Sequence, residues 1–99
     1  MGYRLLPEAA TELDGIWLYV ARESGNPEIA DRLIETIVGR FQLLGKQPQM
    51  GRRRDHDLRP ELRSFPVGVY VIIYRIEHHN ALILRVMHGS RDISGILNE

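Results

Sequence analysis

Two consecutive stretches rich in β-branched, aromatic and other apolar residues limit most strongly what this chain can fold into. They span residues 69–76 and 81–87, and the polar segment Glu77-His78-His79-Asn80 separates them. Such runs joined by a short polar segment are typical of a β-hairpin, with His78-His79 most simply its turn. Because both strands are apolar almost throughout, we expect both faces of the hairpin to be at least partly covered.

Two amphipathic helices are predicted before this hairpin. Pro7 suits the first turn of a helix, Ser24-Gly25 ends that helix, and Asn26-Pro27 combines a capping amide with a proline at the first position of the next one. Joined by so short a turn, the two helices form a helical hairpin that covers one face of the sheet, and a partner protein is a candidate cover for the other. We expect the following apolar side chains to be mainly core: Ala9, Leu13, Ile16, Trp17, Tyr19 and Val20 in the first helix, and Ala30, Leu33, Ile34, Ile37, Val38, Phe41 and Leu44 in the second.

The remaining segments complete an α+β fold. Residues 3–6 are a short strand before Pro7, residues 47–51 close the second helix, residues 52–57 are a charged loop, and residues 93–97 are a short, helix-compatible tail. Residues 62–67 alternate as a strand does, and Pro66 indicates an edge position or the strand's end. The predicted order is β-α-α-β-β-β, with the helical hairpin packed on one face of a mainly antiparallel sheet, and residues 1–99 form one domain.

The composition excludes several classes of protein. With 43% apolar and 26% charged residues the chain is expected to fold, and with no cysteine it has neither a disulfide framework nor a thiolate metal site. His56 and the pair His78-His79 lie in no recognisable ligand spacing, so we predict no metal and no cofactor. No apolar run reaches the roughly 20 residues that span a bilayer, and no secretory leader is visible. We therefore expect a cytoplasmic protein without a membrane partner.

The charge is balanced overall but unevenly distributed. The formal net charge is zero, which gives no general attraction to nucleic acid, yet residues 51–99 hold eight basic and six acidic side chains. All basic residues except Lys46 are arginines, which favour planar, bidentate contacts to phosphate or carboxylate. The run Arg52-Arg53-Arg54 is either a solvated surface or a contact for DNA or an acidic partner, and the sequence does not choose between these two readings.

Several local patterns, in this order, resemble the RelE/ParE toxin superfamily over almost the full chain. The first helix carries Ala10, Leu13-Asp14, Ile16 and Tyr19, and the exit from the second reads Pro48-Gln49-Met50-Gly51. Leu62-Arg63 opens the next strand, the segment 70–75 resembles the aromatic-flanked central strand, and the segment 83–92 resembles the closing strand with its turn His88-Gly89-Ser90-Arg91-Asp92. The resemblance implies a RelE/ParE-like fold and the toxin of a type II toxin-antitoxin system.

The superfamily has two activities, and the residues must choose between them. RelE-like members cleave messenger RNA on the ribosome, which requires a base, an acid and cations at the phosphate. Arg63, Arg85, Arg91 and His88 supply part of this set, and a nuclease would use Arg63, His88 and Arg91 as its catalytic residues. Yet Lys46 is the only lysine, and no tyrosine follows His88, whereas RelE-like nucleases carry a lysine cluster or a carboxylate base and a C-terminal tyrosine. The sequence therefore favours a ParE-like inhibitor of DNA gyrase, with no catalytic residues of its own.

The resemblance also implies partners. A ParD-like antitoxin would neutralise the toxin by folding a flexible segment onto it, in a higher-order toxin-antitoxin assembly, and a non-toxic antitoxin-binding module is the further alternative. The target is DNA gyrase or, alternatively, the ribosome with its mRNA. Candidate target-binding residues are Arg52, Arg53, Arg54, Arg63, Arg85, His88 and Arg91.

Five of the notable side chains also have plain structural interpretations. Arg75 and Arg85 are expected on neighbouring strands, where solvation or pairing with Glu77 is favoured over contact with the target. For His88, a histidine at a strand end whose ring bonds a backbone carbonyl is as good an explanation as catalysis. The tyrosine at position 19 and its neighbour Trp17 are expected in the core rather than in a ligand site.

Overall fold

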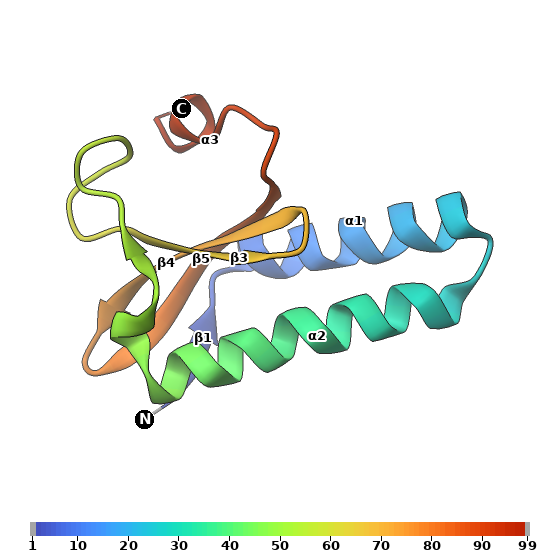
Figure 1. The fold of residues 1–99 in the computed structure, drawn as a ribbon, viewed down its shortest axis with the longest axis horizontal. Helices are drawn as coiled ribbons and strands as arrows, with labels where there is room; N and C mark the ends of the chain where they lie inside the picture. Colours follow the sequence, from blue (N-terminus) through green and yellow to red (C-terminus); the bar gives the residue numbers. More distant parts are fainter. Residues whose placement is uncertain (1, 99) are drawn as a thin grey trace.

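The computed structural model describes residues 2–98, which form a five-stranded sheet with helices on both faces (Figure 1). The two long helices are α1 (Pro7–Ser24) and α2 (Pro27–Lys46), and the third, α3 (Ile93–Leu97), is short. The strands are β1 (Tyr3–Leu5), β2 (Arg52–Arg53), β3 (Arg63–Val67), β4 (Tyr70–Glu77) and β5 (Asn80–His88), and a 3-10 turn, η1 (Pro48–Met50), follows α2. The predicted α+β layout is confirmed.

The sheet has the strand order β1-β5-β4-β3-β2. β1 pairs in parallel with β5, and the other three pairings are antiparallel, so the sheet is mainly antiparallel as predicted. β2 pairs only with Arg63 and Ser64, which leaves Pro66 in a part of β3 that has β4 as its one neighbour. Because proline has no N–H to donate, this edge position suits it. The charged loop predicted at residues 52–57 thus begins with a two-residue strand.

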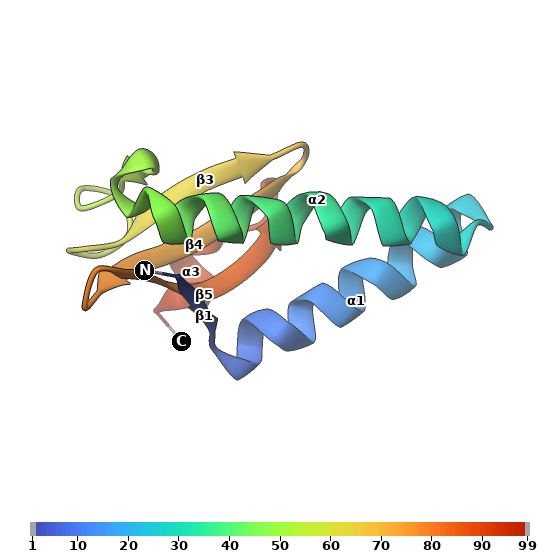
Figure 2. The same ribbon diagram turned by 90° about the horizontal axis from the view of Figure 1, so that it is seen from below.

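The ends of the helices follow from the sequence signals. Asn26 caps α2 by accepting a hydrogen bond of 2.9 Å from the backbone N–H of Glu28, and Pro27 occupies the first helical position. Gly25 closes α1 with a φ of 66°, a left-handed conformation that glycine adopts without strain. The closed end of this hairpin extends beyond the sheet in both views (Figures 1 and 2). No helix in residues 2–98 is long and apolar enough to cross a membrane.

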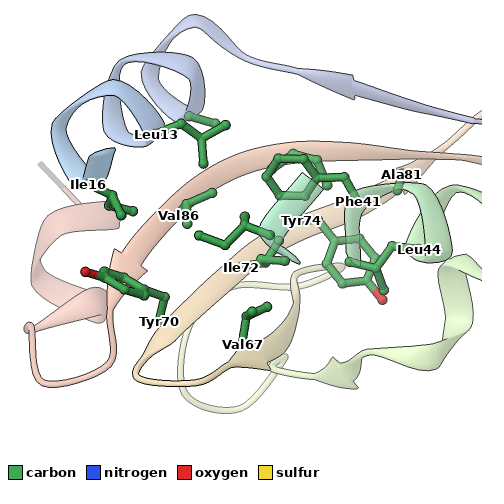
Figure 3. Packing of buried hydrophobic residues seen from close by; sticks show 13 residues of the cluster. Leu13, Ile16, Phe41, Leu44, Val67, Tyr70, Ile72, Tyr74, Ala81 and Val86 are labelled. Atoms are coloured by element: carbon green, nitrogen blue, oxygen red, sulfur yellow. The ribbon is translucent and has the colours of Figure 1, made fainter. Parts of the chain in front are cut away.

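The main core lies between the helical hairpin and one face of the sheet (Figure 3). Figure 3 shows Ile16 and Tyr70 together at one end of this cluster, and Leu44 and Tyr74 at the other. Trp17 is half-buried, and its indole Nε1–H donates a 2.7 Å hydrogen bond to Asp31 of α2. Tyr19 is 62% exposed, so the prediction of a core position for it was wrong. It lies in the C-terminal half of α1.

A smaller apolar cluster covers the opposite face of the sheet. Its buried members are Leu62, Ile73, Leu82, Leu84 and Met87. The packing against them comes from α3 and from the loop before β3, through partly buried residues that include Leu58, Ile93, Ile96 and Leu97. Both faces of the central hairpin are therefore covered, as its composition predicts, and this chain itself supplies much of the second cover.

Candidate functional site

A β-bulge in β5 shapes the region where the sequence places its candidate site. Ile73 pairs with Arg85 and Tyr74 pairs with Ile83, so Leu84 is an extra residue opposite β4. The extra residue shifts the alternation of side chains by one position. As a result Ile83 and Val86, three residues apart, both face the helices. A bulge of this kind changes the direction in which the following side chains point, and here these are the last residues of β5, up to His88.

Glu12 of α1 binds the bulged segment. One carboxylate oxygen accepts hydrogen bonds from Arg85 Nε at 3.0 Å and from the backbone N–H of Val86 at 2.9 Å, while the other accepts from Arg85 Nη2 at 2.9 Å. Both side chains are mostly buried, with exposed fractions of 17% for Glu12 and 24% for Arg85. This bidentate pair ties α1 to the edge of β5. The prediction that Arg85 is either solvated or paired with Glu77 was wrong, whereas Arg75 does pair with Glu77, at 3.0 Å.

A groove of about 570 Å³ opens beside this pair, between α1 and the region where β4 begins and β5 ends. The wall from α1 consists of Glu12, Gly15, Ile16 and Tyr19, at the spacing of one helical face. The remaining lining residues are Val69, Tyr70, Val86, Met87, His88 and Arg91. Most of this lining is apolar, and the groove brings together two predicted site residues, His88 and Arg91.

The His88 ring is held by two neighbours. It lies edge-on against Tyr70 at 5.7 Å between ring centroids, and its Nδ1 lies 3.1 Å from the backbone N–H of Ser90 and 2.7 Å from the Ser90 hydroxyl. Because a backbone N–H only donates, Nδ1 is an acceptor here and the neutral ring carries its proton on Nε2. The ring therefore bonds a backbone N–H, and the alternative of a bond to a backbone carbonyl was wrong. Burial, with a smaller contribution from nearby Tyr19, raises the pKa of Tyr70, so its hydroxyl keeps its proton.

Arg63 lies in a different part of the molecule. Its Nη1 donates to the backbone carbonyls of Gln49 at 3.1 Å and Gly51 at 2.9 Å, at the exit from α2. Arg63 pairs with Tyr74 on β4, whereas His88 pairs with Tyr70 from the other side of that strand. At about 3.3 Å per residue, the two sites are roughly 13 Å apart along β4. The structure does not bring Arg63 together with His88 and Arg91.

The arginine run 52–54 divides between the surface and the protein. Arg52 and Arg53 are exposed on the edge strand β2, and Arg53 donates to Asp55 at 2.8 Å. Arg54 bonds both Asp57, at 2.5 Å, and the buried Ser64 hydroxyl, at 3.0 Å. The hydrogen bonds that Arg54 donates to Asp57 raise the pKa of the Arg54 guanidinium. Only part of the run is thus available to a partner.

Sequence reasoning missed Glu12 and Gly15. Glu12 reads as a carboxylate near the start of a helix, and nothing in its spacing shows that it reaches a strand 73 residues later. Within residues 2–98, no three side chains of the metal-binding types gather into one cluster.

Comparison with known proteins identifies the family of this chain. A family model described as the ParE toxin of the type II toxin-antitoxin system parDE matches residues 3–93. The chain belongs to the ParE toxin family. It is thereby a toxin of a type II toxin-antitoxin system, within the larger group of ParE and RelE toxins.

Curated relatives of this ParE-family chain come from Caulobacter vibrioides. Toxin ParE3 is 31% identical over 88 residues, which cover 89% of this chain and 86% of the relative. Toxin ParE1 is 33% identical over 88 residues, covering 89% and 88% respectively. Toxin RelE3 is 34% identical over 63 residues, covering 64% of this chain and 68% of the relative.

Two solved structures share the fold of this ParE-family chain. The chromosomal ParDE toxin-antitoxin system from P. aeruginosa gives a TM-score of 0.76 at 23% identity, over 89% of this chain and 95% of that one. The toxin-antitoxin complex RelBE2 from Mycobacterium tuberculosis gives 0.53 at 22% identity, over 88% and 95% respectively. The RelE/ParE-like fold expected from the sequence is confirmed.

Proposed function

We propose that this chain acts as an inhibitor of DNA gyrase and that a ParD-like antitoxin neutralises it. The observation that carries the proposal is the internal bonding of two arginines that an RNA cleaver would need at the phosphate. Arg85 is engaged by Glu12, and Arg63 by the carbonyls of Gln49 and Gly51. The match to the ParE family model, over residues 3–93, supports the same choice.

The position of His88 also supports an inhibitor that acts by binding. A general acid must donate its proton to the leaving oxygen, with cations near the phosphate that carries the developing charge. Here Nδ1 of His88 accepts from Ser90, and Arg91 is the one predicted cation that shares its groove. An inhibitor that stabilises the cleaved-DNA state of gyrase needs surface complementarity only.

Gyrase assays test the proposal directly. The purified chain, added to gyrase with relaxed plasmid, is expected to reduce supercoiling and to accumulate cleaved DNA. The same chain first mixed with purified antitoxin serves as the control and should leave both reactions unchanged. Supercoiling and cleavage that are unaffected by a folded sample would contradict the proposal.

The alternative is a ribosome-dependent mRNA endonuclease. The similarity to RelE3 and the shared groove of His88 and Arg91 favour it. It predicts cut messenger in a ribosome-programmed translation reaction. His88→Gln is the informative variant, because its amide oxygen still accepts from the Ser90 N–H but the side chain transfers no proton near neutral pH. Message that this variant leaves intact and the unaltered chain cuts would establish the nuclease. A non-toxic antitoxin-binding module would bind the antitoxin and leave both reactions unchanged.

A further inference from the structure

Two arginines lie opposite each other at the β2 edge of the sheet. Arg53 of β2 pairs with Arg63 of β3 in the antiparallel register, so both side chains lie on the same face. Like charges placed directly opposite in this way destabilise a sheet. The two arginines also line one hollow of about 270 Å³, together with Glu61, Leu62 and Ile76. An anion bound in this hollow would turn an unfavourable pair into a favourable one.

Internal bonding fixes Arg63 and leaves part of Arg53 open. Arg63 donates to the neutral carbonyls of Gln49 and Gly51, and it forms no ion pair with any residue between 2 and 98. Arg53 uses its Nε, which donates to Asp55 at 2.8 Å. Within the same described range the two Nη groups of Arg53 have no hydrogen-bond partner, and its side chain is 69% exposed. Arg63 therefore supplies a fixed charge, and Arg53 supplies N–H groups for a ligand.

Asp55 holds the Arg53 guanidinium in place. One oxygen of Asp55 accepts from Arg53 Nε, and the other accepts from the backbone N–H of Glu61 at 2.9 Å. Glu61 has a φ of 71°, a left-handed conformation that is strained for a residue with a side chain. The same carboxylate thus stabilises the strained loop and orients the arginine. An oriented guanidinium loses less freedom when it binds an anion, which favours bidentate contact through its Nη groups.

The surrounding charges favour a polyanion over a single carboxylate. Residues 51–63 hold five arginines and three carboxylates. Two of these arginines, Arg52 and Arg59, are exposed and form no salt bridge with any residue from 2 to 98. Glu61 lines the hollow, yet it forms no salt bridge with Arg53 or Arg63. A DNA strand presents phosphates at regular spacing, so several arginines can act on one backbone.

We propose that this hollow binds a backbone phosphate of the DNA held by gyrase. The Nη groups of Arg53 donate to the phosphate oxygens, and Arg63 adds its charge. The inference rests on the proposed function, because gyrase presents the DNA. It deepens that function by assigning the contact with DNA to the β2 edge. The groove beside His88 remains separate, since Tyr70 and Ile76 lie at the two sites and are about 20 Å apart along β4.

Arg53→Gln tests the contact. The measured quantity is the concentration of the full chain that gives half-maximal accumulation of plasmid cleaved by gyrase. Arg53→Gln is expected to raise this concentration about tenfold, because a charged bidentate contact is lost. Arg32→Gln is the matched control, since it removes an exposed arginine of α2 that does not line the hollow, and it should leave the concentration unchanged. The amide of the Arg53→Gln variant can still donate to Asp55 and no longer repels Arg63, so thermal unfolding should show no loss of stability.

Glu61→Gln changes the charge of the hollow in the opposite direction. It removes the carboxylate from the lining and keeps the backbone N–H that Asp55 accepts. The required concentration should therefore fall, by about threefold for one exposed charge. A purely structural role for these residues would not make the chain more potent.

Binding measurements identify the source of the anion. The affinity of the chain for gyrase is measured by calorimetry with and without bound duplex DNA, and Arg53→Gln should weaken binding only when DNA is present. Weaker binding of this variant to gyrase without DNA would show that the hollow meets an acidic protein surface and would overturn the proposal. Equal potency of Arg53→Gln and the original chain would overturn the phosphate site and leave the proposed function standing. No effect of the original chain on gyrase would overturn the proposed function itself, and this inference with it.

Discussion

Tyr74 is a fully buried residue whose hydroxyl forms two hydrogen bonds with the backbone. Its hydroxyl accepts from the backbone N–H of Gly51 at 2.8 Å and donates to the carbonyl of Pro48 at 2.7 Å, and the side chain is fully buried. It thereby fixes the corner after α2, where the sequence carries Pro48-Gln49-Met50-Gly51. Gly51 has no room for a side chain, since an added Cβ atom would collide with the Tyr74 ring.

Tyr74→Phe should therefore destabilise the protein by about 1–3 kcal/mol, because the Gly51 N–H remains buried without an acceptor. The measurement is urea unfolding followed by circular dichroism. Tyr19→Phe is the control, since Tyr19 is exposed and the loss of its hydroxyl leaves no buried backbone group without an acceptor. Equal stability of Tyr74→Phe and the original chain would show that the corner does not depend on this hydroxyl.

The same residue predicts a pH dependence. Burial raises the pKa of Tyr74 above its ordinary value of 10.0, although the Gly51 hydrogen bond and Arg63 act in the opposite direction. Below pH 10.0 the hydroxyl keeps its proton in both states, so its contribution to stability is fully present. As the pH rises above that value, the unfolded chain loses the proton first and stability falls. Tyr74→Phe should lose less stability between pH 9 and pH 11 than the original chain does, and parallel losses would contradict this.

Glu12 is the residue that couples the two layers at the groove. Glu12→Gln should destabilise the protein by about 2 kcal/mol, because an amide cannot accept both hydrogen bonds from Arg85 and the guanidinium is left without its counter-charge. Glu35→Gln, at an exposed position of α2, is the matched control and should change stability by less than about 0.5 kcal/mol. Denaturant unfolding of both variants provides the comparison. A Glu12→Gln effect as small as that of the control would remove the coupling role.

The two strand turns of the central sheet differ in how well their residues suit them. Glu77 pairs with Asn80, so His78 and His79 form a two-residue turn, and their φ angles of 51° and 67° are those of a type I′ turn. This conformation is strained for histidine. The preceding turn instead has Gly68 at a φ of 58°, which glycine adopts at no steric cost.

Replacing His78-His79 by Asn-Gly should stabilise the protein by about 1 kcal/mol, because these residues tolerate left-handed backbone. In a domain of this size that corresponds to a rise of roughly 4–8 °C in the midpoint of thermal unfolding. Gly68→Ala should lower the midpoint, since alanine is strained at that φ. An unchanged midpoint in the Asn-Gly variant would mean that the histidines make compensating contacts.

Local sequence signals predict the long elements of this fold and miss the features that depend on pairing across the chain. Asn26-Pro27 marks the start of α2 and the apolar runs mark β4 and β5, because capping and periodicity act within a few residues. The bulge at Leu84 leaves no such signal. It is visible only once β5 is aligned with β4, and it decides which side chains face the helices.

The same limit applies to the candidate site. His88 and Arg91 are close in sequence and do share the groove, whereas Arg63 and Arg85 are bonded by residues that are distant in the chain or have no distinctive pattern. From the sequence alone, an arginine on a predicted strand is taken to be a free cation, because its bonding partner is known only from the structure. The exposure of Tyr19 was missed for a related reason, because the sequence does not show that this aromatic residue lines an open groove between α1 and the sheet.

At the scale of the whole molecule, two apolar clusters lie on opposite faces of one sheet, and they are unequal. The helix-side cluster includes Ile37, Phe41 and Leu44, all completely buried, and joins both long helices to the sheet. On the other face, α3 is one short turn whose residues are only partly buried. For a domain of this size the total stability is roughly 5–15 kcal/mol, so losses in the main cluster are a large fraction of it.

Ile37→Ala should cost about 2–5 kcal/mol, since it removes a buried side chain and leaves a cavity that both helices and the sheet would have to close. Ile96→Ala, the same chemical change on the partly buried face of α3, should cost less than about 1.5 kcal/mol, because solvent already reaches that residue and the short helix can adjust. Urea unfolding of both variants, with the slope against denaturant unchanged, gives the comparison. If the two losses proved equal, α3 would hold the second face as firmly as the helical hairpin holds the first. The two faces of the sheet would then contribute similarly to the unfolding free energy of this toxin, and the cluster beneath the long helices would not dominate it.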